Sequence, residues 1–244
     1  MKFALRLFAL LLVAGATLLC AADKKIAVSA KTIDSGSFGV FIDGKRVATE
    51  TFRIEQSGDN SITRSEFKVE DATKAYQTSE MTLAANGDLR RYSWNELSPS
   101  KAQAVIEPQD QFLVEHLTLT GAEKPVDQPY ILPPSTVILD DYFFSQRELL
   151  AWRYLGSSCQ QRAGQTECKL SKAQYGALIP RQRTSVLVNL EFIGSETVSV
   201  HGQPRRLTRF NLQAEGSDWA LWLDDEHKLV RIYIAADRTE VVRD

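Results

Sequence analysis

The chain has 244 residues, of which 43% are hydrophobic and 25% are charged, and its formal net charge at pH 7 is −2. A chain of this length and composition can bury a substantial core, so one large domain accounts for it. The basic pairs Arg90-Arg91 and Arg205-Arg206 are short, and solvated strand faces explain them. Because nucleic-acid binding requires the neutralisation of many phosphates, the sequence argues against DNA or RNA as a partner.

The first residues have the pattern of a secretory signal. Lys2 and Arg6 precede an uncharged apolar stretch over residues 7–19, and small residues lead to a predicted cleavage after Ala22. The apolar stretch is shorter than the roughly 20 residues of a membrane-spanning helix. We therefore expect an exported protein, periplasmic or secreted, with a signal peptide at 1–22 and a single β-rich domain at 23–244. The mature part keeps 27 of the 29 basic residues against 31 acidic ones, a net charge of −4.

Cys20 leaves an alternative open. A cysteine at the end of a signal segment can be lipidated and become the mature N-terminus, which would anchor the protein to the envelope. The residues immediately before it, Leu18 and Leu19, are larger than the residue that a lipoprotein signal favours there. Removal of Cys20 with the signal peptide is the favoured interpretation. Peripheral association with the envelope is compatible with removal of Cys20 and with its lipidation.

Two hairpin turns are predicted in the first half of the mature chain. Asp43-Gly44 and Asn86-Gly87 are strong hairpin signals, because a tight turn needs positive φ, which Gly, Asn and Asp tolerate. Alternating apolar residues flank the first turn, with a change of phase that suggests a bulge near Lys45. Further strands are expected at 62–70 and 111–118.

The start of the mature chain resembles its end. Residues 40–55, VFIDGKRVATETFRIE, align without a gap with residues 198–213, VSVHGQPRRLTRFNLQ. Residues 81–94, MTLAANGDLRRYSW, align in the same way with residues 221–234, LWLDDEHKLVRIYI. The repeat predicts two antiparallel meander halves, at about 36–120 and about 183–243.

A connection and one helix are predicted between these halves, over about 121–156. Pro125 to Pro134 should not hold a regular ladder, because proline lacks a backbone donor and restricts its neighbour. Ser145 and Glu148 form a capping-box pattern, which predicts a helix that runs to about Leu155 and stops at Gly156. Its broad apolar arc must be covered by the sheet.

Cys159 and Cys168 lie nine residues apart in a polar loop at 157–170. In an oxidising compartment such a pair predicts a disulfide. A metal site would need nearby histidine or C-x-x-C spacing, and neither is present.

The sequence contains no recognisable catalytic or cofactor motif. It has three scattered histidines, His116 on an expected strand and His201 and His227 at expected turns, and it lacks a nucleophile elbow, a zincin motif and a phosphate-binding glycine loop. The acidic pairs at 140–141 and 224–226 lack the alternating oxygen ligands of a calcium loop. We therefore expect no enzyme activity, no cofactor and no metal.

Two motifs carry a resemblance to known proteins. The motif F-x-V-x-I-D-G-K-x-V-x-T-E-T-F-x-I at 38–54, the motif D-W-x-L-W-L-D-D-x-x-K-L-V-R-I at 218–232 and the segment at 137–155 resemble a group of uncharacterised exported β-rich domains of Gram-negative bacteria. The expected architecture is also similar to the open half-barrels of periplasmic lipoprotein carriers, which is an analogy of shape that transfers no residue. The fold expected is mainly β: one strongly curved antiparallel sheet or open half-barrel of two meander halves, with a central helix packed on it.

These observations favour a non-catalytic protein that binds an apolar or amphipathic ligand, such as a lipid or acyl chain. The candidate ligand-lining residues are Phe143, Phe144 and Trp152, which the sequence also allows as core residues. The alternatives are a structural or interaction protein of the cell envelope with a filled core and, with less support, an envelope hydrolase. The sequence does not indicate an oligomeric state.

Overall fold

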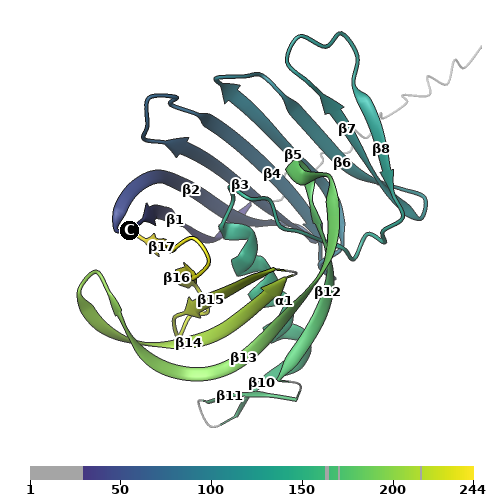
Figure 1. Ribbon diagram of the computed structural model, residues 1–244. Coiled ribbons are helices and arrows are strands. Elements are labelled where there is room, and N and C mark those ends of the chain that lie inside the picture. Colours follow the sequence, from purple (N-terminus) through teal and green to yellow (C-terminus); the bar gives the residue numbers. More distant parts are fainter. Residues whose placement is uncertain (1–29, 163–164, 170, 215) are drawn as a thin grey trace, which may run out of the picture.

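The computed structural model describes residues 30–162, 165–169, 171–214 and 216–244 (Figure 1). The predicted signal peptide and Cys20 lie outside the described residues. Among the described residues, none forms a helix with the length and apolar character needed to cross a membrane.

Fifteen strands form one large sheet, and the first half of the chain supplies eight of them in sequence order. These strands are β1 (Lys31–Ile42), β2 (Lys45–Ser57), β3 (Asn60–Val69), β4 (Tyr76–Ala84), β5 (Leu89–Ser98), β6 (Gln103–Gln109), β7 (Phe112–Thr118) and β8 (Val126–Tyr130). Each pairs antiparallel with the next, which makes a continuous meander.

The second half of the chain adds the remaining strands. They are β9 (Val137–Ile138), β12 (Lys172–Ile179), β13 (Thr184–Val200), β14 (Gln203–Ala214), β15 (Ser217–Leu223), β16 (Leu229–Ile234) and β17 (Thr239–Arg243). The last strand, β17, pairs with β1, so the two halves join through the two ends of the described chain. Short β9 runs parallel to β12 at one edge, β8 forms the other edge, and these two edges do not pair among the described strands.

The sheet curls into an open barrel-like shape around α1 (Ser145–Ser158), as Figure 1 shows. The expected fold class is therefore confirmed: a mainly β protein with one strongly curved sheet that does not close, and one helix packed on it. Strands of both halves and the helix contribute to a single large apolar core. Alternation along each strand produces this arrangement, because every second side chain faces the interior.

The resemblance between the two ends of the chain extends to backbone conformation. Asp43 and Gly44 have φ values of 51° and 76°, and the aligned His201 and Gly202 have values of 50° and 75°. Two successive positive φ angles fit the tight turn that matches the twist of a hairpin. The partners of Phe41 and Val40 are Arg46 and Ala48, so Val47 is the extra residue and the predicted bulge lies in β2, just after the first turn.

Two expectations about local structure were wrong. Residues 126–130 of the proline-rich connection form β8, in which Pro129 lies opposite Val114 of β7. Proline is tolerated there because β8 is an edge strand. The helix passes Gly156 and ends at Ser158, where the chain enters a small separate hairpin.

That hairpin consists of β10 (Cys159–Arg162) and β11 (Gln165–Cys168). Cys159 and Cys168 are directly paired across it and form the predicted disulfide. The bond therefore closes a hairpin that begins directly after α1. A short helix, η1 (Pro180–Gln182), separates β12 from β13.

Candidate functional site

The start of α1 is held by a carboxylate from the sheet. The backbone N–H of Phe144 donates to Oε2 of Glu50 on β2 at 2.7 Å, and the Ser145 hydroxyl donates to Oε1 of Glu50 at 2.7 Å. The Ser145 and Ser65 hydroxyls lie 3.0 Å apart, which ties β3 to the same point. The first amide groups of a helix have no partner within the helix, and here Glu50 satisfies them.

The predicted capping box was therefore wrong, since no side chain of α1 caps its own first turn. The Ser145 hydroxyl is engaged by Glu50. Glu148 instead lies in the core next to Asp34 of β1, and burial and the nearby Asp34 charge raise the pKa of Glu148 to about 10. Asp34 itself pairs with Arg243 of β17. Contacts of Ser145 with Glu50 of β2 and Ser65 of β3 therefore take the place of the expected capping interaction within the helix.

A second polar cluster fixes the segment before α1. Asp140 is fully buried and accepts hydrogen bonds from the Tyr92 hydroxyl at 2.5 Å and from Nε of Arg181 at 2.9 Å. The Arg181 guanidinium lies 4.1 Å from the ring centroid of Trp94. Tyr92 and Trp94 belong to β5 and Arg181 belongs to η1. The carboxylate of Asp140 thus connects the two halves instead of capping the helix.

Beyond these anchors, α1 and the sheet leave a cavity of about 580 Å³, here called the first cavity. It extends between the second half of α1, the end of β4 and the segment around β9. Its apolar lining consists of Ile33, Ile54, Met81, Leu83, Ala84, Val137, Ile138, Leu149, Leu150 and Trp152. This volume is typical of small-molecule sites in proteins.

One corner of the first cavity is polar. Arg153 lines it and donates from Nη1 to the carbonyl oxygen of Ser135 at 2.8 Å. The neighbouring Thr136 also lines the cavity, is only 3% exposed, and its hydroxyl has no hydrogen-bond partner within the described chain. That hydroxyl oxygen is itself buried, so Arg153 is the group at this corner that a ligand can reach. Five further polar side chains line the cavity: Gln56, Ser61, Asn86, Gln146 and Ser157. The cavity therefore combines largely apolar walls with scattered polar side chains and a cation.

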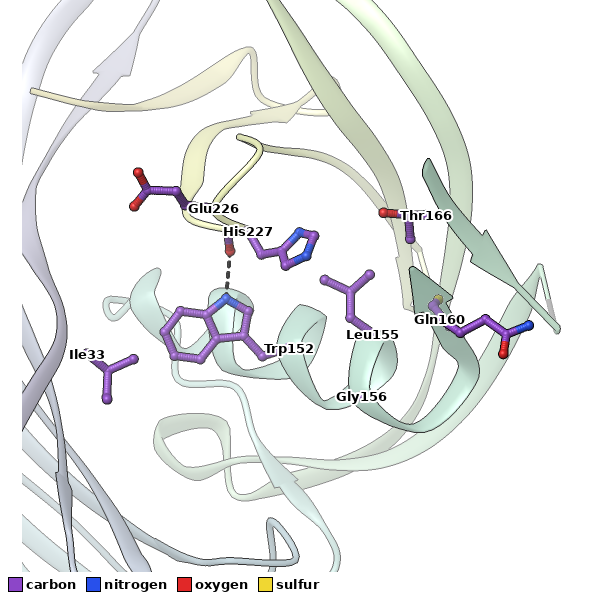
Figure 2. Close-up of a pocket in the computed structure, with 9 residues that line it drawn as sticks. Ile33, Trp152, Leu155, Gly156, Gln160, Thr166, Glu226 and His227 are labelled. Carbon is purple, nitrogen blue, oxygen red and sulfur yellow. Dashed lines mark hydrogen bonds between the residues drawn. The ribbon is translucent and has the colours of Figure 1, made fainter. Parts of the chain in front are cut away.

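A smaller second cavity of about 400 Å³ also has Trp152 in its lining (Figure 2). Its lining residues are Ile33, Trp152, Leu155, Gly156, Cys159, Gln160, Thr166, Glu226 and His227. The disulfide-bonded hairpin and the turn between β15 and β16 form part of its wall. The indole of Trp152 projects from α1 towards that turn (Figure 2).

A third cavity of about 690 Å³ lies near the start of α1. Phe67, Tyr142, Phe144 and Trp219 supply its aromatic wall, and Arg147 lies 4.7 Å from the Trp219 ring centroid. Several charged side chains of both signs also line it: Lys45, Arg46, Glu70, Asp71, Asp141 and Asp237. The first cavity differs in its charge, because Arg153 is the one charged residue among the described residues of its lining.

The three aromatic residues singled out from the sequence lie in different places. Trp152 lines the first and second cavities, and Phe144 lines the third. Phe143 is fully buried, with Arg181 6.0 Å from its ring centroid, and is a core residue. The structure therefore does not bring the three together at one site.

The alternation of residues along β2 indicates from the sequence alone that Glu50 is buried. Glu50 is in phase with Ala48, Phe52 and Ile54, all of which are buried. An acid in the apolar phase of a strand must find partners inside the protein. Glu115 on β7 shows the same pattern and accepts a hydrogen bond from Tyr130 at 2.7 Å.

The histidines do not form a metal centre. His116 Nδ1 lies 2.7 Å from Asp127, and His201 Nε2 lies 2.7 Å from the carbonyl oxygen of Arg243. The described residues contain no group of three or more potential metal ligands among His, Cys, Asp and Glu.

Comparisons with known proteins agree with the fold. No protein-family model matches the chain, and no curated protein matches its sequence. Its fold is similar to the crystal structure of a beta-barrel-like protein of domain of unknown function DUF1849 from Brucella abortus, with a TM-score of 0.52, over 89% of this chain and 95% of that chain. The sequence identity is 8%, so the similarity shows the fold alone. It supports a resemblance to uncharacterised β-rich bacterial domains.

Glu50 predicts a pH dependence of stability. Burial raises its pKa from 4.5 to about 7, although the hydroxyls of Ser145 and Ser65 favour the charged form. The folded chain then binds this proton more tightly than the unfolded chain does. The contribution of Glu50 to the free energy of unfolding should be greatest below about pH 4.5 and fall by up to about 3 kcal/mol as the pH rises to 7.

The test compares urea unfolding of wild type and Glu50→Gln across this pH range. The amide keeps the shape and an acceptor for Phe144 but cannot titrate. The difference in unfolding free energy between the two proteins should change between pH 4.5 and 7, whereas Glu148 contributes equally to both. A difference that is independent of pH would contradict the assignment.

Proposed function

We propose that this protein binds an amphipathic molecule with an acyl chain and an acidic head group, and that it does so without catalysis. The observation that carries the proposal is the first cavity, whose largely apolar walls contain a charged side chain, Arg153. Burial of an acyl chain against these walls is favourable by about 0.8 kcal/mol for each methylene group. A carboxylate beside Arg153 would accept hydrogen bonds from the guanidinium.

Arg153 suits this role because its guanidinium is only partly used. One nitrogen donates to Ser135, and the group lies 5.7 Å from the ring centroid of Tyr175. A guanidinium has five N–H donors, so donors remain for a planar anion. An acidic amphipath thus fits both the shape and the charge of the cavity.

The proposed setting is the bacterial cell envelope. The signal-like segment at 1–22 favours export, and the Cys159–Cys168 disulfide is compatible with an oxidising compartment. In this proposal the protein resembles the periplasmic lipoprotein carriers in the way an open sheet shelters an acyl chain. That parallel rests on shape and on no shared residue.

A hydrolase has less support. The acids with strongly raised pKa values, Glu50 and Glu148, are both fully buried, and neither is among the residues that line the three cavities described above. A catalytic acid must reach its substrate. Glu50 instead holds the start of α1, which favours a binding role over catalysis.

Filling the first cavity should abolish binding. Leu83 lines the cavity at the end of β4 and is in phase with the buried Met81, so the larger ring system of Leu83→Trp would occupy space intended for the acyl chain. We expect the affinity for a long-chain fatty acid, measured by calorimetric titration of the delipidated protein, to fall at least about tenfold. Ala122→Trp, on an exposed turn after β7, is the matched control and should bind like wild type. Equal affinities for all three proteins would contradict the proposed site.

The head group can be tested separately through Arg153. Loss of a charged hydrogen bond should weaken binding of a fatty acid to Arg153→Leu by about tenfold to a hundredfold. The fatty alcohol of the same chain length lacks the negative charge, so its affinity should change much less. An equal loss for acid and alcohol would show that Arg153 acts on the cavity's shape and not on a carboxylate.

A further inference from the structure

The first and second cavities adjoin at Trp152. Their linings share Ile33, Trp152 and Gly156, and Trp152 is the largest of these three side chains. We therefore treat the Trp152 side chain as the partition between the two cavities. Because a side chain can change rotamer, such a partition can move.

A single hydrogen bond orients the indole. Its Nε1–H donates to the carbonyl oxygen of His227 at 2.6 Å, as the dashed line in Figure 2 shows. His227 lies in the turn between β15 and β16, in which Asp224 accepts hydrogen bonds from the backbone N–H groups of Glu226 and Lys228. The turn is well braced, so the acceptor has a fixed position. The indole itself is only partly buried.

Gly156 provides room next to this partition. It follows Trp152 by four residues, so both lie on the same face of α1. A Cβ placed on Gly156 would meet no atom within 4 Å, apart from its immediate surroundings along the helix. A glycine inside a helix lowers its stability, and Gly156 is exposed. Here it leaves the space beside the indole open on a face that lines both cavities.

We propose that Trp152 determines the length of acyl chain that the protein accepts. With the indole hydrogen-bonded to His227, the chain is confined to the first cavity. When the indole turns away, the chain passes over Gly156 and continues into the second cavity. This inference rests on the proposed function, since it assigns a specificity role within the same site.

The test measures affinity for saturated fatty acids of increasing chain length. Each methylene that gains apolar cover should tighten binding about fourfold, until the chain fills the space available. For wild type the gain should level off at the length that fills the first cavity. Trp152→Ala should continue to gain affinity beyond that length, because the second cavity becomes continuous with the first.

Three further variants separate the partition from general damage. Trp152→Phe keeps a ring but loses the bond to His227, so its limit should lie between those of wild type and Trp152→Ala. Addition of Gly156→Leu to Trp152→Ala should block the passage and restore the shorter limit. Trp219→Ala removes a tryptophan from the third cavity and should leave the limit unchanged.

The outcomes distinguish the two proposals. If wild type and Trp152→Ala level off at the same chain length, the partition is overturned while the binding function stands. If folded wild-type protein binds no fatty acid of any length, the proposed function falls and the partition falls with it.

Discussion

The fold depends on the carboxyl group of Glu50 at the start of α1. A helix enclosed by a sheet cannot leave its first amide groups to water, and Glu50 accepts from Phe144 and Ser145 in their place. Asp140, just before the helix, accepts hydrogen bonds from Tyr92 of β5 and Arg181 of η1. Polar contacts thus set the position of the helix, so its position does not require close apolar packing along its whole length. This explains why cavities are present beside the second half of α1.

The open sheet also explains why the helix belongs to both halves of the chain. The meanders meet through β1 and β17, but the opposite edges β8 and β9 do not pair among the described strands. Contacts made by α1 and the segment before it connect the two halves of the sheet where these edges do not pair. Asp140 bonds to Tyr92 of the first half and to Arg181 of the second, and Trp152 bonds to the turn at His227. The helix therefore braces an incomplete barrel and forms one wall of its cavities.

Much of this architecture could be predicted from local patterns. The turn at Asp43-Gly44, the strand alternation and the Cys159–Cys168 bond all depend on neighbouring residues or short spacings. Local patterns failed where distant contacts decided the outcome. Ser145 and Glu148 have capping-box spacing, yet Glu50, about 95 positions away, caps the helix. Thr136 and Arg153 form a polar corner only because β9 packs beside α1, and no spacing in the sequence reveals that proximity.

The most direct test of the account is native mass spectrometry of the protein isolated from its native source without detergent. A helix braced by polar anchors beside an unfilled apolar cavity should retain an endogenous ligand. The account predicts a mass above that of the chain, which falls on gas-phase activation as an acidic molecule with an acyl chain is released. A folded protein that shows only the mass of its own chain, before and after incubation with a lipid extract, would contradict it.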